Sequence, residues 1–254
     1  MNLFLLSDLH LALANPVRLA AFGHWWNDHE PRMAKAWDNA VGLDDLVLVP
    51  GDISWAQTAN AARPDMTWLG ARPGRIYLSP GNHDRWWRSQ ERLAGVLPRN
   101  ATPVPGDWLP FHGGMIASTL GMTAPSDRFF GPRERQQWPG ALQQLRQLLD
   151  RLPERQDQLN AAFSILMMHY PPCDGLGVLS EMGALVEAAG VTLCVYGHFH
   201  QPAEWANARL GLHGSTTWAI GSADALGFAP LRLGSIRRGR LTLLPITPPP
   251  GPES

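Results

Sequence analysis

Residues 46–52 read LVLVPGD, an apolar run that ends in Gly51 and Asp52. A short apolar run closed by proline and glycine predicts a strand buried on both of its faces. Runs of similar length occur at 3–6, 75–78, 163–168 and 191–196. Between the runs, apolar residues recur at helical spacing, which predicts helices at 32–41, 60–70, 84–95, 140–152 and 179–189. This alternation of strands and helices predicts an α/β fold.

Each of the five runs is followed directly by residues of the kinds that bind metal ions. The five blocks are Asp8-Leu9-His10, Gly51-Asp52, Gly81-Asn82-His83-Asp84, His169-Tyr170-Pro171 and Gly197-His198-Phe199-His200. Since the carboxyl ends of strands in an α/β sheet border one crevice, we expect these side chains to converge. A mixture of carboxylate, imidazole and amide groups suits two borderline divalent ions such as Mn²⁺, Fe or Zn²⁺.

The glycines in these blocks are expected to let the chain turn sharply off each strand, so that the next side chain faces the site. They are Gly51, Gly81 and Gly197. In the blocks 8–10 and 198–200, an extended backbone would place the two outer side chains on one side and the apolar middle residue on the other. We therefore expect both blocks to be extended.

The rest of the chain predicts one domain. Glycine-punctuated pieces at 216–220, 231–236 and 240–244 predict antiparallel strands that complete a second sheet. The segment 99–130 is rich in proline and glycine, and a long stretch without structure predicts a lid or a substrate-facing insertion. We expect a single domain over 1–246 and a flexible Pro-rich tail over 247–254.

The composition and charge of the chain limit which classes of function are plausible. The 254 residues are 44% hydrophobic and carry 21 basic and 22 acidic side chains, for a formal net charge of −1. This scattered, balanced charge argues against long-range attraction of nucleic acid. Two cysteines are too few for a disulfide framework. With neither a basic leader nor a stretch of about 18 apolar residues, a cytoplasmic protein without a membrane partner is expected. The oligomeric state stays open.

The five blocks, in this order from Asp8 to His200, resemble the calcineurin-like metallophosphoesterase family. The resemblance implies an α/β fold built as a two-sheet sandwich flanked by helices. It also implies two metal ions that share Asp52 as a bridging carboxylate. One ion would be held by Asp8, His10, Asp52 and His200, and the other by Asp52, Asn82, His169 and His198.

The resemblance further implies the chemistry. Water activated between the two ions would attack phosphorus in line, without a covalent phosphoenzyme. His83 resembles the family's catalytic histidine, which stabilises the developing charge or protonates the leaving oxygen. Asp84 would either orient His83 or cap a following helix. Arg85 is a candidate phosphate clamp.

Two departures from the family pattern bear on the substrate. Phosphoprotein phosphatases of the family carry a second acidic residue three positions after the bridging aspartate, where this chain has Trp55. The lipid A pathway pyrophosphate hydrolases usually have arginine where this chain has His83. Both branches are therefore disfavoured, and a small phosphorylated molecule is the leading substrate class. The choice between monoester and diester stays open.

Two other functions remain as alternatives. A nuclease would use the same blocks but needs a basic groove, and the chain offers only the cluster Arg237-Arg238-Gly239-Arg240. A non-catalytic interaction scaffold would have less reason to keep every ligand intact. Histidines outside the blocks are expected to be structural: His24, His29, His112 and His213. Packing is likewise favoured over substrate stacking for Trp55, Trp86 and Trp87.

Overall fold

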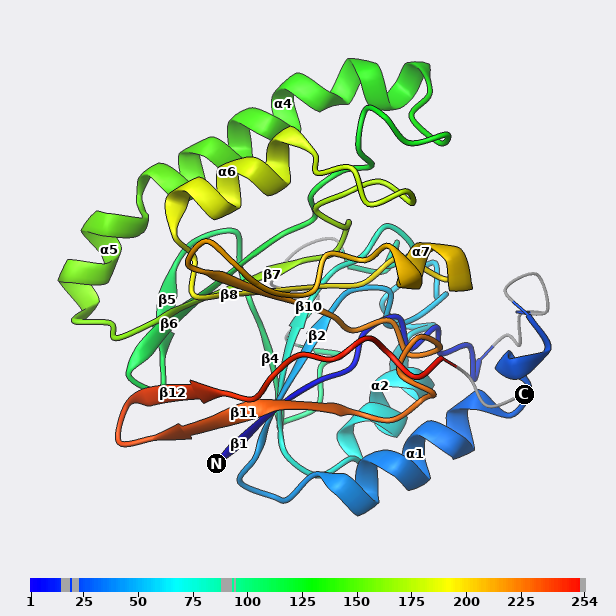
Figure 1. Cartoon of the computed structure of the whole chain (residues 1–254). Helices are drawn as coiled ribbons and strands as arrows, with labels where there is room; N and C mark the ends of the chain where they lie inside the picture. Colours follow the sequence, from blue (N-terminus) through cyan, green and yellow to red (C-terminus); the bar gives the residue numbers. More distant parts are fainter. Residues whose placement is uncertain (15–18, 20–22, 88–92, 94, 252–254) are drawn as a thin grey trace.

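The computed structural model describes residues 1–14, 19, 23–87, 93 and 95–251. Within these residues the chain forms two six-stranded sheets that pack face to face between two layers of helices (Figure 1). The predicted two-sheet α/β sandwich flanked by helices is confirmed. No helix in the described ranges is both long and apolar enough to cross a membrane.

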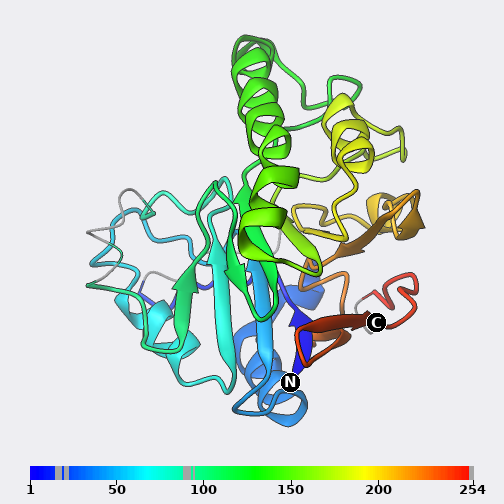
Figure 2. The same ribbon diagram turned by 90° about the vertical axis from the view of Figure 1, so that its left-hand side faces the viewer.

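The first sheet contains both the first and the last strand of the described chain. Its strands, in spatial order, are β12 (Arg240–Leu243), β11 (Leu231–Arg237), β1 (Asn2–Leu5), β2 (Leu46–Pro50), β3 (Arg75–Ser79) and β4 (Ala101–Pro103). The strands β1 to β4 are parallel, whereas β11 is antiparallel to both β1 and β12. Figure 2 shows the blue β1 beside the orange-to-red hairpin of β11 and β12.

The second sheet has four parallel strands between two antiparallel edges. Its order is β5 (Leu109–Phe111), β6 (Gly114–Thr119), β7 (Ser164–Met168), β8 (Leu193–Tyr196), β10 (Thr216–Ile220) and β9 (Gly211–His213). The strands β6, β7, β8 and β10 are parallel, and short hairpins add β5 and β9 at the edges.

Alternate residues of the strands face different layers, which explains why the runs are apolar throughout. Leu46 and Leu48 of β2 pack between the sheets, whereas Val47 and Val49 pack under the helices of the first sheet. Those helices are α1 (His29–Ala40) and α2 (Arg63–Gly70). The second sheet is covered by α4 (Pro132–Asp150), α5 (Leu152–Leu159) and α6 (Glu181–Ala189), and α7 (Pro202–Ala206) follows β8.

Two predictions about the fold are wrong. The segment 99–130 is not structureless, because it contains β4, β5 and β6, and β6 is the parallel partner of β7. The strands predicted after Gly211 do not all complete the second sheet. Strands β9 and β10 join it, but β11 and β12 extend the first sheet beside β1.

Two further predictions are only partly covered by the structure. Half of the predicted helix 84–95 lies outside the described residues, and 84–87 form a turn. The predicted tail carries no regular structure as far as Gly251, whose N–H donates to the carbonyl of Ala225 at 2.9 Å. Part of the stretch predicted to be flexible is therefore fastened to the domain.

Candidate metal centre

The five predicted blocks follow the carboxyl ends of five parallel strands, three in the first sheet and two in the second. The strands are β1, β2, β3, β7 and β8. The loop after β1 bonds to the loop after β2 through Asp8 N to Gly51 O and His10 N to Asp52 O, both at 3.0 Å. In the second sheet, Gly197 N donates to His169 O at 3.1 Å. These bonds place the predicted blocks side by side, as the positions of the strand ends suggested.

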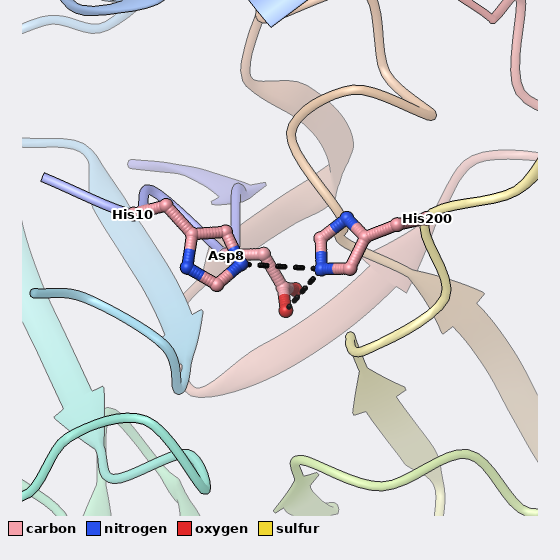
Figure 3. Close-up of side chains that lie close together, drawn as sticks. All are labelled: Asp8, His10 and His200. Carbon is pink, nitrogen blue, oxygen red and sulfur yellow. Dashed lines mark hydrogen bonds and ion pairs between the residues drawn. The ribbon is translucent and has the colours of Figure 1, made fainter. Parts of the chain in front are cut away.

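The first cluster is formed by Asp8, His10 and His200 (Figure 3). The Nε2 atoms of His10 and His200 are 3.2 Å apart, and His200 Nε2 lies 3.5 Å from Asp8 Oδ1. All three side chains are buried. Two nitrogen donors that each lie about 2.1 Å from one ion are roughly 3.0–3.4 Å apart at octahedral or tetrahedral angles. The spacing of the two histidines therefore fits a shared ion.

The second cluster is formed by Asp52, His169 and His198, and Asn82 lies among them. Asn82 Oδ1 is 2.9 Å from His169 Nε2 and 3.1 Å from His198 Nδ1. Asp52 Oδ1 is 3.5 Å from His169 Nε2. The side chains predicted to hold a second ion thus turn their donor atoms toward one another.

Asp52 lies between the clusters. Its Oδ1 faces His169, while its Oδ2 is 3.9 Å from His10 Nε2 of the first cluster. Oδ2 is buried and accepts no hydrogen bond from the described residues. A buried carboxylate oxygen without a hydrogen bond is rare unless something else satisfies it, and a cation does so. Both the position of Asp52 and this orphaned atom fit a carboxylate that touches two ions.

The backbone of the blocks is not extended, contrary to prediction. Asp8, His10, Asp52 and His198 have φ of 55°, 46°, 50° and 74°. Left-handed backbone is strained for residues other than glycine, and such strain concentrates at functional sites. The hydrogen bonds between the loops hold the chain in these turns. The middle residues Leu9 and Phe199 are nevertheless buried among apolar side chains, as predicted.

The glycines serve two different purposes. Gly51 has a φ of 105° and therefore makes the turn that was predicted. Gly81 and Gly197 do not have φ in the left-handed region. A Cβ at Gly81 would overlap Asp52 Oδ1, and one at Gly197 would overlap Asp8 Oδ2. These two glycines give room to carboxylates instead of turning the chain.

Burial and mutual charge set the protonation of the clusters. Burial lowers the pKa of both His10 and His198 well below the ordinary value, and neighbouring imidazoles lower it further. Neutral imidazole is the form that binds metals. Burial raises the pKa of Asp52 to about 6. Burial also acts to raise the pKa of Asp8, but His200, His169 and His10 together hold it well below its usual range.

His83 lies at the open side of the clusters. Its backbone N–H donates to Asp52 Oδ1 at 2.8 Å, and its Nε2 is 4.0 Å from Asp52 Oδ2. The ring contacts Trp55, with centroids 4.1 Å apart, and the side chain remains 33% exposed. Burial lowers the pKa of His83 below its ordinary value. The ring is thus held beside the shared carboxylate and remains accessible from outside.

Asp84 fastens two loops together. Its buried carboxylate accepts hydrogen bonds from the backbone N–H groups of Ile53, Ser54 and Gly81, and from the Trp86 indole, at 2.8 to 3.2 Å. Among the described residues, no hydrogen bond joins Asp84 to the His83 ring. Asp84 is therefore placed to hold the loops after β2 and β3, and a role in orienting His83 stays a prediction.

Arg85 and Arg128 differ in their relation to the clusters. Arg85 is exposed and donates to Gln57 Oε1 at 3.3 Å. A cavity of about 350 Å³ opens beside the clusters and is lined by Asp52, His83 and Arg128, among others. The turn at 84–87 directs Arg85 outward, whereas Arg128 comes from the segment after β6. Arg128 therefore lines the cavity, whereas Arg85 is not among the residues that line it.

Asp224 is a buried carboxylate at the first cluster that belongs to none of the five predicted blocks. It follows β10 and lies 3.0 Å from His200 Nδ1. Burial acts to lower the pKa of His200, but Asp224 and Asp8 hold it well above the ordinary value. In the sequence, the stretch Gly221-Ser222-Ala223-Asp224 could line the substrate side, but turn chemistry explains it equally well.

Three of the histidines expected to be structural have hydrogen-bond partners, and His29 also bonds to the backbone of His10 and Leu9 beside the first cluster. The partners are Trp26 O for His29, Tyr77 Oη for His112 and Leu210 O for His213. Trp86 is buried and bonds to Asp84. Trp55 borders the site by packing between the rings of His10 and His83. Both cysteines, Cys173 and Cys194, are buried as free thiols.

A comparison with protein families identifies the family of the chain. The family model for calcineurin-like phosphoesterases matches residues 1–202, which contain all five blocks. The chain belongs to this family. Its two clusters of histidine and aspartate could each hold a metal ion. Asp224 lies beyond the part that the family model matches.

Curated relatives resemble part of the chain. The Gene 66 protein of Mycobacterium phage L5 is 37% identical over 83 residues, which are 33% of this chain and 40% of that protein. The Gene 66 protein of Mycobacterium phage D29 is 41% identical over 97 residues, or 37% of this chain and 47% of that protein. The match therefore spans less than half of these relatives. A solved protein of unknown function from Aquifex aeolicus gives a TM-score of 0.47 with 14% identity, over 91% of this chain and 94% of that one.

Proposed function

We propose that this phosphoesterase hydrolyses a small phosphate monoester or diester with water activated between two divalent metal ions. The observation that carries the proposal is the position of Asp52, whose two carboxylate oxygens face different clusters. The first ion would be held by Asp8, His10, Asp52 and His200. The second would be held by Asp52, Asn82, His169 and His198.

The donor set supports ions of borderline character. Imidazole nitrogens together with carboxylate and amide oxygens suit Mn²⁺, Fe or Zn²⁺ better than Mg²⁺ or Ca²⁺, which prefer oxygen donors alone. When bound, such ions act as Lewis acids toward a phosphoryl oxygen and lower the pKa of water toward neutrality.

His83 is the proposed catalytic side chain. It lines the cavity at the edge of both clusters, and its Nε2 is 4.0 Å from the shared carboxylate. An imidazole carries an N–H in either protonation state, so His83 can donate a hydrogen bond to a phosphoryl oxygen or to the leaving oxygen. Trp55 packs against the ring and limits its movement.

The size and charge of the cavity fit a small substrate better than they fit a nucleic acid. Its volume of about 350 Å³ suits a small molecule, and its wall carries the carboxylates of Asp127, Glu134 and Glu204 against the single guanidinium of Arg128. A nucleic acid strand would bring several phosphates past these carboxylates, and like charges repel. The nuclease alternative is therefore disfavoured by the wall of the cavity as well as by the charge of the chain.

The backbone at the clusters argues against a non-catalytic scaffold. Each residue other than glycine that is held in left-handed backbone costs about 1–3 kcal/mol, and four of the proposed ligands are held in this way. A scaffold would gain nothing from this strain, whereas a metal site requires the side chains that the strain directs inward.

The metal content of the purified protein tests the proposal. After reloading with Mn²⁺ and dialysis, elemental analysis is expected to find two ions per chain in the wild type and fewer than one in Asp52→Asn. Asp45→Asn is the matched control, since Asp45 is buried at the other end of β2 and its carboxylate bonds, among the described residues, to Asn2 and Gly42. Two ions retained in Asp52→Asn would contradict the bridging role.

A further inference from the structure

We propose that Asp224 is a positioning residue, which holds His200 in the ring orientation and tautomer that the first metal ion requires. The inference rests on the proposed dinuclear function. It concerns a residue that lies beyond the region matched by the family model.

The two nitrogens of His200 face different groups. The Nδ1 atom lies 3.1 and 3.0 Å from Asp224 Oδ1 and Oδ2. The Nε2 atom points the other way, 3.5 Å from Asp8 Oδ1. A carboxylate can only accept, so Nδ1 carries the proton. Because Nε2 also faces a carboxylate, an ion that binds the first cluster would take the place of a proton on Nε2. The ring is then neutral and protonated on Nδ1 alone, and its Nε2 lone pair is directed into the first cluster, as metal binding requires.

Asp224 is itself held in place. The side chain is fully buried, and its carboxylate also accepts from Trp26 Nε1 at 3.3 Å and from Ala225 N at 3.0 Å. Trp26 packs edge-on against His200, with ring centroids 5.8 Å apart. The carboxylate is therefore oriented before any ion binds.

The loop that carries Asp224 is bonded to the loop that carries Asp8. Ser7 N donates to Gly221 O at 2.6 Å, and Ala223 N donates to Ser7 O at 3.0 Å. The strand end that supplies Asp8 and the turn that supplies Asp224 thus move as one unit. This arrangement fixes His200 from both sides.

The second cluster has no comparable carboxylate among the described residues. The corresponding nitrogen of His169, Nδ1, lies 2.9 Å from a backbone carbonyl, Pro50 O. A carboxylate makes its histidine a stronger ligand than a carbonyl does, and losing such a partner typically weakens metal binding 10- to 100-fold. The inference therefore predicts that Asp224 strengthens the first site alone.

Calorimetric titration of the metal-free full chain with Mn²⁺ tests the inference. The wild type is expected to bind two ions, and Asp224→Asn is expected to bind one of them about 10- to 100-fold more weakly while the other is unchanged. Asp45→Asn is expected to match the wild type. Equal affinity for both ions in Asp224→Asn and wild type would overturn the role of Asp224 and leave the proposed function standing. A wild type that binds no ion would overturn the proposed function.

A second measurement needs no variant at Asp224 and so does not depend on that variant folding. In the wild type loaded with diamagnetic Zn²⁺, nitrogen-detected NMR of the histidine rings is expected to show His200 protonated on Nδ1 and not on Nε2. The His200→Gln variant identifies the signal. Protonation on Nε2 would overturn the inference.

Discussion

Gly81 lies so close to Asp52 that a Cβ at position 81 would overlap the Asp52 Oδ1 atom. The Cβ would also overlap the backbone N of Asp52, so rotating the Asp52 side chain cannot relieve the clash. The carboxylate that faces both clusters therefore depends on a neighbour without a side chain.

This contact predicts that Gly81→Ala displaces Asp52 and abolishes binding of both ions. Gly140 provides the control, because it lies inside α4 and an added Cβ meets nothing within 4 Å. Gly140→Ala should keep metal binding and gain up to about 1 kcal/mol of stability. Metal content and urea denaturation measure the two effects. Full metal content in Gly81→Ala would show that Asp52 tolerates the overlap.

The pKa values of Asp52 and Asp8 predict opposite effects on stability. Burial raises the pKa of Asp52 from 3.8 to about 6, so in the metal-free protein its ionised form destabilises the fold above pH 6. Asp52→Asn should thus be more stable than the wild type at pH 7, by on the order of 3 kcal/mol. The gain should shrink as the pH falls from about 6 and vanish below about 3.8, where Asp52 is protonated in both states.

Asp8 provides the contrast, since its pKa is held below the usual range although burial acts to raise it. Its ionised form stabilises the fold above the unfolded pKa, so Asp8→Asn should be less stable than the wild type at pH 7. Urea denaturation in EDTA at pH 4 and pH 7 measures both variants. A change of the same sign for the two variants at pH 7 would contradict the assigned charges.

The bonds of Asp84 predict a structural effect. Its carboxylate satisfies three backbone N–H groups and one indole, all buried. In Asp84→Ala these donors lose their acceptor, and leaving a buried donor unsatisfied costs about 1–3 kcal/mol. The free energy of unfolding in urea should fall by at least that amount. Unchanged stability would mean that the two loops hold their positions without Asp84.

The lining of the cavity predicts which arginine contributes to substrate binding, and therefore to KM. Arg128 lines the cavity, with its guanidinium 3.8 Å from Glu204 Oε1, whereas Arg85 bonds to Gln57 on the surface. A charge-assisted hydrogen bond contributes about 1.5–3 kcal/mol, so Arg128→Ala should raise KM about tenfold or more. Arg85→Ala should change KM less than threefold by the same measure. A larger effect from Arg85 would restore its predicted role as the phosphate clamp.

The sequence predicted the parts of the molecule that depend on local pattern. A run such as Leu46–Val49 is apolar because both of its faces are buried, and the residue after the run is then fixed at the strand end. The positions of the metal-binding blocks could therefore be predicted, because each block follows such a run. The left-handed backbone of Asp8 and His10 does not, because it is imposed by bonds to Gly51 and Asp52, far away in the sequence.

The parts that the sequence did not predict depend on tertiary contacts. Strand β6 contains only three consecutive apolar residues, Met115–Ala117, between glycine-rich turns, and its burial comes from β7 beside it and from the surrounding core. Asp224 lies 24 residues after His200 and acquires its role only where the two side chains meet. Neither feature has a periodicity or spacing that marks it.

The central claim is that this protein hydrolyses phosphate esters with metal ions and His83. The measurement that tests it is the initial rate of nitrophenolate release from bis-p-nitrophenyl phosphate and p-nitrophenyl phosphate, after chelation and again after reloading with Mn²⁺. We predict no turnover after chelation, recovery with Mn²⁺, and a kcat about 10²- to 10⁴-fold lower in His83→Ala with both ions retained. The preferred ester would distinguish diesterase from monoesterase. Turnover that persists in EDTA, or that is unchanged in His83→Ala, would contradict the claim.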